Sequence, residues 1–270
     1  MSKVSVGFIG LGSQGGPMAE RIVDAGYPLT VWARRPEALA PYEAKGAKAA
    51  ASPAELAVGC DIIGLCVVDD AGVAEIAAQL LPAMRKGAIL VIHSTILPES
   101  CVTLAAKAEA LGVVVIDAPV SGGGPGAAAG TLTVMCGGDA EAFRRAKPVL
   151  ETFGKLIVHL GPIGAGQQAK IINNSLLAAN MGLAQAALSA GEALGIERST
   201  LGELIKASSG RSFGFEVFAR LPTPAAFSTG APLLVKDVKL LGSVLPGHVG
   251  QEALRSAAAP FLAAATGQDI

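Results

Sequence analysis

The stretch whose residue types and spacing best indicate a binding site lies near the start of the chain, where a glycine-rich turn joins a strand-like run to a helix-like run. Residues 4–9 are apolar and of strand length, and residues 18–23 have the composition of a helix. Between them stands the spacing G-x-G-x-x-G, written here as Gly10-Leu11-Gly12-Ser13-Gln14-Gly15. In a dinucleotide-binding unit these glycines make the tight turn, admit the pyrophosphate and let the helix pack on the strand. We therefore expect the six residues to bind a dinucleotide at a helix N-terminus, with an ordinary strand-to-helix turn as the alternative.

The end of the second expected strand predicts which nicotinamide cofactor is preferred. An Asp or Glu at this place bonds the ribose 2′-hydroxyl of NAD, whereas an Arg accommodates the 2′-phosphate of NADP. The strand 29–33 is followed by Arg34 and Arg35, with no carboxylate before Glu37. A guanidinium matches a phosphate through two parallel hydrogen bonds. We expect NADP, with Arg34 on its phosphate and Arg35 assisting; a solvated arginine pair is the alternative.

The composition favours an enzyme-sized α/β protein and disfavours several other classes. Of the 270 residues, 51% are hydrophobic but only 4% are aromatic, so Ala, Val, Leu and Ile fill the core, as in parallel sheets covered by helices. The net charge is −1 and basic residues are spread along the chain, which favours neither nucleic acid nor an anionic membrane as a partner. No apolar stretch is long enough to span a bilayer.

Cysteine usage and the first residues predict a cytoplasmic protein without a metal. Cys60, Cys66, Cys101 and Cys136 are scattered without C-x-x-C spacing. Buried free thiols in a reducing compartment are therefore expected. Residues 1–9 have the pattern of a strand rather than that of a signal peptide.

The order of elements predicts two domains. Strand-like and helix-like runs alternate through residues 1–160, which is typical of a doubly wound parallel sheet. From residue 166 to 194 the chain reads as one long Ala-rich helix, and everything after it reads as helix and loop. We therefore expect an α/β protein: an N-terminal Rossmann domain over residues 1–162, then an all-α domain over 163–270. A small substrate would bind between them.

Four blocks of sequence, spread over nearly the whole chain, resemble the β-hydroxyacid dehydrogenases, which include 3-hydroxyisobutyrate dehydrogenase and the semialdehyde reductases. The blocks are Val6 to Ala19, Asp117-Ala118-Pro119-Val120-Ser121-Gly122-Gly123, Gly164 to Asn174, and Lys236-Asp237 followed by Leu240. The resemblance implies that the second block anchors the substrate and that the third holds the catalytic lysine, Lys170. It also implies that Lys236 lies near nicotinamide and substrate, that Thr95 contacts both, and that Val67 contacts the cofactor.

The residues themselves agree with these implied roles. Backbone N–H groups of Ser121, Gly122 and Gly123 can form a nest for a carboxylate at the carboxyl end of a strand. Lys170 and Asn174 are four apart and share one face of the long helix. A lysine in an otherwise apolar helical stretch is costly to bury unless it has a partner or a task. The alternative is that Lys170 extends to solvent.

The expected reaction is hydride transfer between NADP(H) and a small β-hydroxy acid or its semialdehyde. Lys170 would be the general acid or base, and Asn174 would bond the substrate hydroxyl or orient Lys170. A lysine near its usual pKa of about 10.4 is a poor base at neutral pH, so burial or a neighbouring cation such as Lys236 would have to lower it. His93, just before Thr95, is either a residue satisfied at a strand end or a second titratable group of the site.

Alternative functions remain open at this level. An imine reductase shares the architecture, although the resemblance implies a residue other than lysine at position 170. 6-Phosphogluconate dehydrogenase shares the N-terminal motifs but has a much larger C-terminal domain. An NADP-binding sensor without turnover is a third possibility. The Ala-rich helix also suggests close packing between subunits, so a homodimer or homotetramer is expected, with a small carboxylate as the substrate.

Overall fold

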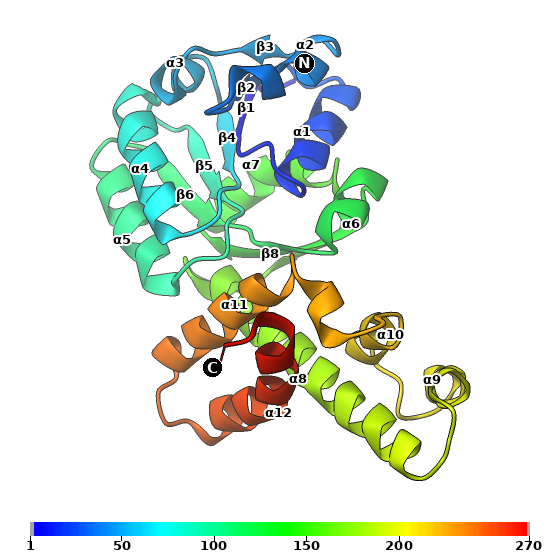
Figure 1. Cartoon of the computed structure of the whole chain (residues 1–270). Coiled ribbons are helices and arrows are strands. Elements are labelled where there is room, and N and C mark those ends of the chain that lie inside the picture. Colours follow the sequence, from blue (N-terminus) through cyan, green and yellow to red (C-terminus); the bar gives the residue numbers. More distant parts are fainter. Residues whose placement is uncertain (1–2, 269–270) are drawn as a thin grey trace. The chain divides into compact units, whose positions relative to one another are not determined.

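The computed structural model describes residues 3–268 and divides into two compact units, Met1–Lys170 and Ile171–Ile270. The sequence places its expected boundary at residues 162 and 163, at a proline–glycine hinge. The long helix α8 begins in the first unit and continues into the second. Each unit is described below by itself (Figure 1).

The N-terminal unit is built on a nine-stranded sheet with the order β3-β2-β1-β4-β5-β6-β8-β7, and β9 pairs with β8. The strands are β1 (Val6–Ile9), β2 (Leu29–Trp32), β3 (Lys48–Ala49), β4 (Ile62–Leu65), β5 (Ile89–Ile92), β6 (Val114–Asp117), β7 (Val120–Ser121), β8 (Leu132–Gly138) and β9 (Gly154–His159). The six strands from β3 to β6 are parallel, which confirms the doubly wound sheet.

Two strands, β8 and β9, run opposite to the parallel strands, because β8 is antiparallel to β6 and β9 is parallel to β8. β8 runs antiparallel to β6 and to β7. Only residues 122–131 connect β7 to β8, which is short of the dozen or more residues that a parallel crossover needs. The expected strand near residues 132–136 is therefore present, but the chain has to enter it in the reverse direction.

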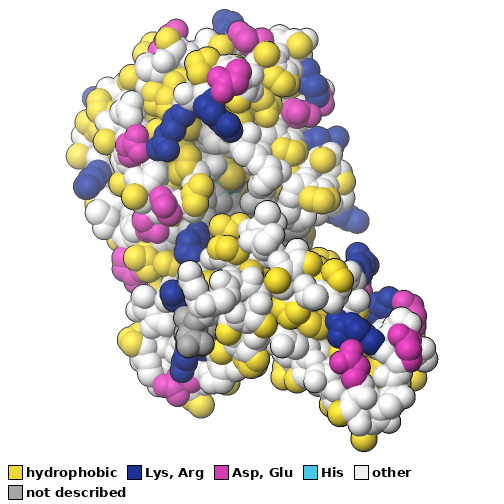
Figure 2. Space-filling model, in the orientation of Figure 1, with side chains coloured by type: hydrophobic (Ala, Val, Ile, Leu, Met, Phe, Trp, Pro, Cys, Tyr) yellow, Lys and Arg dark blue, Asp and Glu magenta, His cyan; other side chains and the backbone are white. Residues whose placement is uncertain are grey.

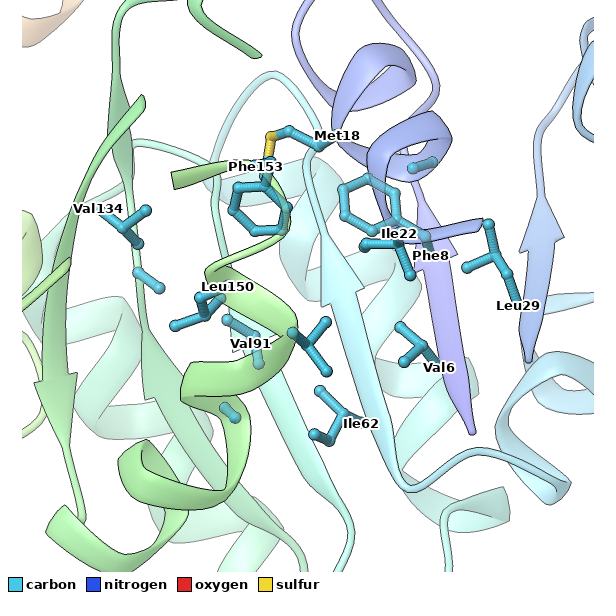
Figure 3. Close-up of a cluster of buried hydrophobic side chains, with 14 of the residues drawn as sticks. Val6, Phe8, Met18, Ile22, Leu29, Ile62, Val91, Val134, Leu150 and Phe153 are labelled. Atoms are coloured by element: carbon cyan, nitrogen blue, oxygen red, sulfur yellow. The ribbon is translucent and has the colours of Figure 1, made fainter. Parts of the chain in front are cut away.

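Helices cover both faces of this sheet, and each face has its own core. The helices of the unit are α1 (Gly15–Asp24), η1 (Pro36–Ala38), α2 (Ala40–Glu43), α3 (Pro53–Val58), α4 (Asp70–Leu80), η2 (Leu81–Ala83), α5 (Pro98–Glu109), α6 (Gly123–Ala129) and α7 (Ala140–Leu150). One core joins α1 and α7 to residues such as Phe8, Val91 and Phe153 (Figure 3). The other joins α3, α4 and α5 to Ile63 and Leu90 on the opposite face.

Helix α6 is an element that the sequence analysis missed. Its stretch is rich in glycine, which is a poor helix former, so only its ends carry a signal. Gly122 precedes it with φ 129°, and Gly130 ends it in the left-handed conformation that C-terminal glycines commonly adopt. The helix forms because it packs on α1 and β8.

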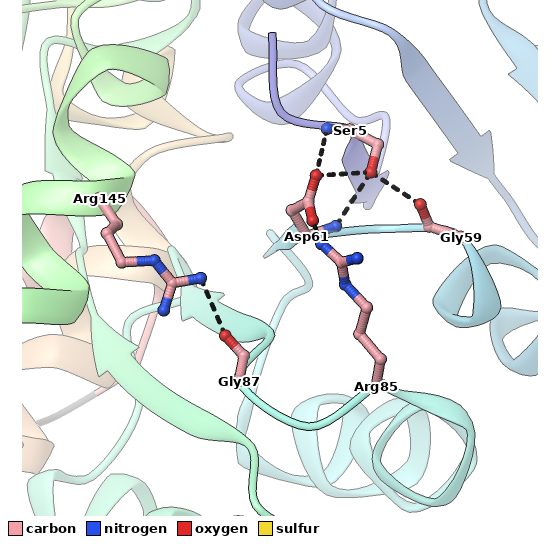
Figure 4. A network of polar contacts seen from close by, with 6 residues as sticks. All are labelled: Ser5, Gly59, Asp61, Arg85, Gly87 and Arg145. Carbon is pink, nitrogen blue, oxygen red and sulfur yellow. Dashed lines mark hydrogen bonds and ion pairs between the residues drawn. The ribbon is translucent and has the colours of Figure 1, made fainter. Parts of the chain in front are cut away.

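A polar network holds the amino ends of two strands together (Figure 4). The carboxylate of Asp61, just before β4, accepts bonds from the backbone N–H and the hydroxyl of Ser5, just before β1, at 2.7 and 2.9 Å. Arg85 forms an ion pair with the same carboxylate. This network lies at the edge of the sheet opposite the glycine turn, because that turn follows the carboxyl end of β1.

The second unit is helical, as expected. It contains the rest of α8 (Ala165–Ala193), followed by α9 (Arg198–Ala207), α10 (Phe213–Ala219), η3 (Pro224–Phe227), α11 (Ala231–Val244) and α12 (Val249–Thr266). Phe218 meets Phe261 edge-on in its core, with ring centroids 5.8 Å apart. Phe215 is also a core residue, whereas Phe213 is 71% exposed.

A Cβ on Gly182 of α8 would lie 1.9 Å from the carbonyl oxygen of Ala257. The small residue therefore allows α8 to pack closely against α12 of the same chain.

Surface features match the composition. On the face shown in Figure 2, Lys and Arg side chains lie among Asp and Glu side chains rather than in one block. Among residues 3–268, no helix is long and apolar enough to cross a bilayer.

His93, which directly follows β5, is a residue of the first core. It is 4% exposed, and its Nδ1 lies 2.8 Å from the carbonyl oxygen of Ala118. The ring stacks on Phe8 and meets Phe153 edge-on. Burial lowers the pKa of His93 to about 4, although the bond to Ala118 opposes the shift. Of the two readings of this histidine, the structure supports the satisfied core residue.

We expect this buried imidazole to make the N-terminal unit sensitive to acid. Its pKa is lower in the folded state than its ordinary value of 6.5, so the unfolded chain binds the proton more tightly. Its stabilising contribution is present at neutral pH and is lost as the pH falls from 6.5 to about 4. Between pH 7 and pH 4 the wild type should lose about 3 kcal/mol more unfolding free energy than His93→Gln. Urea unfolding followed by the fluorescence of Trp32, the single tryptophan, measures this difference; parallel pH curves for the two proteins would contradict it.

Candidate functional site

The glycine turn has the geometry that the spacing predicts. Gly10 has φ 101°, and a Cβ there would lie 2.0 Å from the carbonyl oxygen of Cys66. A Cβ on Gly15 would lie 2.0 Å from the carbonyl oxygen of Gly10, so the helix reaches the strand end only because both residues are glycines. A Cβ on Gly12 would meet nothing within 4 Å. This middle glycine therefore leaves open the space that a pyrophosphate needs.

A cavity of about 700 Å³ lies at the carboxyl ends of β1, β2 and β4, next to this turn. Six of the predicted cofactor residues line it, namely Gly10, Leu11, Gly12, Arg34, Arg35 and Val67. Trp32, Val68 and Ile76 add apolar walls that suit a base, and the two arginines supply positive charge just after β2. The residues present therefore fit the adenosine half of a nicotinamide dinucleotide. Ser13, Gln14 and Thr95 are not among the lining residues.

The cavity also holds an acidic residue that the sequence analysis did not identify. Arg34 Nη2 lies 2.7 Å from Glu75 Oε2, a residue of α4, and both side chains are more than half exposed. Glu75 is 41 positions away in the sequence, so no spacing rule pointed to it. The charge of Arg34 is thus already shared with a carboxylate inside the cavity.

The predicted substrate loop begins at β7. Ser121 is half-buried, and Gly122 and Gly123 have φ values of 129° and 64°, which only glycine adopts readily. These residues lead into α6, so their N–H groups lie at a helix start, where an anion is favoured. A Cβ on Gly124 would lie 2.7 Å from the carbonyl oxygen of Ser13. The substrate loop and the glycine turn are therefore direct neighbours.

Lys170 lies in the second turn of α8 and is 8% exposed. The start of this helix is bonded to Asp117, the last residue of β6. The two oxygens of this carboxylate accept the N–H groups of Gly164 and Gln167, both at 2.7 Å. Burial raises the pKa of Asp117, and the two N–H bonds oppose the shift. Because Asp117 opens the block that ends in the substrate loop, one strand end positions both that loop and the helix of Lys170.

In the helical unit, Asn174 is engaged with a buried carboxylate. Its Nδ2 donates to Asp237 Oδ2 at 2.5 Å, and Asp237 on α11 is 2% exposed. Lys236 Nζ lies 3.6 Å from the other oxygen of Asp237, and its side chain is half-buried. Lys239 on the same helix is exposed. The sequence analysis had Asp237 in a recognised block but gave it no role; Asn174 is the residue that it orients.

Burial keeps the cysteine thiols of this chain protonated at neutral pH. All four cysteines are free thiols; Cys60, Cys101 and Cys136 are buried and Cys66 is half-buried. Burial raises the pKa of the Cys66 thiol, beside the cofactor cavity, to about 12, so it is not a thiolate nucleophile at neutral pH. Within residues 3–268, no group of three His, Cys, Asp or Glu side chains is placed to hold a metal ion.

Comparison with known proteins agrees with this geometry. Residues 5–161 match the family model of the NAD-binding domain of 6-phosphogluconate dehydrogenase, and residues 164–268 match that of the NAD-binding domain of NADP-dependent 3-hydroxyisobutyrate dehydrogenase. The NAD-dependent L-serine dehydrogenase of Pseudomonas aeruginosa is 40% identical over 255 residues, covering 87% of this chain and 83% of the relative. Human mitochondrial 3-hydroxyisobutyrate dehydrogenase is 36% identical over 251 residues, covering 88% and 75%.

A solved structure of a 3-hydroxyisobutyrate dehydrogenase has the same fold as this chain. The 3-hydroxyisobutyrate dehydrogenase of Mycobacterium tuberculosis, solved with L-serine, superposes with a TM-score of 0.86 at 30% identity and covers 99% of this chain and 96% of that one. The open glycine turn, the cavity beside it and a buried lysine on the long helix are therefore set in a shared architecture. The chain belongs to the β-hydroxyacid dehydrogenase family and is a nicotinamide-dependent oxidoreductase that acts on a hydroxyl group.

Proposed function

We propose that this protein interconverts a short 3-hydroxy acid and its semialdehyde, with Lys170 as the general acid and base. The observation that carries the proposal is the burial of Lys170 on a helix whose first turn is bonded to the strand that leads into the Ser121–Gly123 loop. The names of the relatives support the substrate class, because L-serine and 3-hydroxyisobutyrate both carry a carboxylate and a hydroxyl on C3.

The residues of the chain would bind, orient and move a proton. The N–H groups of Gly122 and Gly123, with the Ser121 hydroxyl, would bind the substrate carboxylate. In reduction the Lys170 ammonium would donate its proton to the carbonyl oxygen; in oxidation the neutral amine would accept the hydroxyl proton. Asn174, held by Asp237, would bond the reacting oxygen. The nicotinamide, when bound, supplies or accepts the hydride.

The Lys170 role predicts loss of turnover with retained cofactor binding. We expect Lys170→Ala to lower kcat by about a hundred- to ten-thousandfold, the usual contribution of general acid–base catalysis. Activity would be followed by nicotinamide absorbance, with L-serine and 3-hydroxyisobutyrate in one direction and glyoxylate and the succinic, tartronic and methylmalonic semialdehydes in the other. Cofactor binding would be followed by the fluorescence of Trp32, which lines the cavity.

The matched control is Lys239→Ala, at an exposed lysine of α11, which should leave both measurements unchanged. Activity of Lys170→Ala within a few-fold of the wild type would overturn the assignment. Cofactor binding without turnover of any acid would instead favour an imine substrate or a sensor, and assay with a cyclic imine would separate these two.

We further propose that the preferred cofactor is NADP(H). Arg34 and Arg35 line the cavity and no carboxylate follows directly on β2, which supports this preference. The NAD dependence named for the relative from Pseudomonas aeruginosa points the other way. The ion pair with Glu75 bears on the choice, because it occupies part of the guanidinium of Arg34. Exposed ion pairs are worth about 0–1 kcal/mol, so a phosphate can displace this one at a small cost.

The cofactor proposal predicts opposite effects from the two members of that ion pair. Arg34→Ala should weaken NADPH binding about tenfold or more and leave NADH nearly unchanged, because only NADPH carries the 2′-phosphate. Glu75→Gln should strengthen NADPH binding several-fold, because it frees the guanidinium and removes a like charge. Titration of both cofactors against each variant measures this. Equal losses for NADH and NADPH in Arg34→Ala would contradict the phosphate-binding role.

We also propose that the protein is a homodimer or homotetramer that associates through α8. Ile172, Leu176 and Leu183 are 47%, 49% and 59% exposed and lie on one stripe of this helix. Single exposed apolar residues are ordinary, but a row of them along one helix is typical of an interface.

A charge on this stripe should break the assembly. Light scattering is expected to give a multiple of the 27.0 kDa chain mass for the wild type and one chain mass for Leu183→Glu. Ser189→Glu, off the stripe of the same helix, should not change the mass. A wild type of one chain mass would contradict the proposal.

A further inference from the structure

Gln167 is a fully buried polar side chain that takes no direct part in the proposed reaction. It lies in the first turn of α8 and is 0% exposed. Its Oε1 accepts the N–H of Ile96 at 3.2 Å, and its Nε2 donates to the carbonyl oxygen of Ser94 at 2.8 Å. The amide therefore holds the main chain on both sides of Thr95, as a residue of a neighbouring parallel strand would.

The backbone N–H of Gln167 is hydrogen-bonded as well as its side chain. Its N–H donates to Asp117 Oδ2 at 2.7 Å, so one residue joins the loop after β5, the end of β6 and the start of α8. Ser94 extends the connection to the cofactor cavity, because its hydroxyl accepts the N–H of Val67 at 2.8 Å. The Cys101 thiol of α5 is a neighbour of the same side chain. Three segments that carry predicted site residues are thus hydrogen-bonded, directly or through Ser94, to one residue, Gln167.

Close backbone packing leaves this arrangement little freedom. A Cβ on Gly166 would lie 2.2 Å from the carbonyl oxygen of Met135 and 2.7 Å from Asp117 Oδ2. A Cβ on Gly137 would lie 2.5 Å from Asp117 Oδ1. The first turn of α8 is therefore seated directly on β8 and β6. We therefore expect a change in the side-chain bonds of Gln167 to displace the loop around Thr95 rather than the start of α8.

We propose that Gln167 is a positioning residue that fixes Thr95 relative to Lys170. Lys170 is one turn after Gln167 on the same helix, so the two residues lie on one side of α8, and both are buried. The proposal rests on the proposed roles of Lys170 as general acid and base and of Thr95 as a contact of nicotinamide and substrate. A displacement of about 1 Å between reacting groups can cost about a hundredfold in rate, which is the effect that this amide prevents.

The test replaces the amide with side chains of the same length. Gln167→Met removes both side-chain bonds, and we expect kcat per folded molecule to fall about ten- to hundredfold. The binding of ADP, which reports on the adenosine half of the cavity through Trp32 fluorescence, should stay within about twofold. Gln168→Met, at the exposed neighbouring position, is the matched control and should behave as the wild type.

A second variant separates positioning from packing. In Gln167→Glu the neutral carboxyl can still accept from Ile96 and donate to Ser94, whereas the carboxylate places a negative oxygen against the Ser94 carbonyl and near Asp117. The ratio of its kcat to that of the wild type should therefore rise as the pH is lowered. The titratable groups next to this residue are Asp117, which accepts its backbone N–H, and the Cys101 thiol of α5, and both are present in the wild-type reference.

The controls keep the outcomes distinct. Leu150→Ala, in the core of the same unit and away from α8, lowers stability without touching the network. Equal losses of kcat in Leu150→Ala and Gln167→Met, or a pH-independent ratio for Gln167→Glu, would overturn the positioning role. Full turnover by Gln167→Met beside an inactive Lys170→Ala would also overturn it and leave the proposed function standing. An active Lys170→Ala would overturn the proposed function itself.

Discussion

The N-terminal unit depends on the buried carboxylate of Asp117. Helix α8 begins after Gly164, a residue with no side chain to cap it, so its first N–H groups need an acceptor from elsewhere. Asp117 accepts the N–H groups of both the cap position and the third helical residue. A capping box serves the same two donors from within the helix. Here a strand end serves them, and this ties the long helix to the sheet.

Glycines make that contact possible, for the same reason that they make the cofactor turn. At Gly137 and Gly166, as at Gly10 and Gly15, a Cβ would fall within 3 Å of a backbone or carboxylate oxygen. The protein thus uses backbone-to-backbone approach twice on one edge of the sheet. One approach opens space for a pyrophosphate, and the other seats the helix that carries Lys170. Sites built this way are held by main chain, which moves less than side chains on loops.

Much of the fold was predictable because it follows from local patterns. The parallel strands, the glycine turn and the long helix each follow from residues adjacent in the chain, and each is confirmed. Each failure has its own physical cause. Helix α6 has a composition that disfavours helix and forms through packing, and β8 is reversed because the segment before it is short.

Part of the candidate site could likewise be predicted from the sequence, and part could not. The sequence by itself determined the glycine turn, the arginine pair, the Ser121–Gly123 loop and the long helix of Lys170, since each is a contiguous run whose spacing has a physical meaning. Only the tertiary structure decided which groups act on them: Glu75 on Arg34, Asp237 on Asn174, and Gln167 on the chain around Thr95. These partners are 41 to 73 positions apart. Contacts of that range depend on how the elements pack, and no local spacing records them.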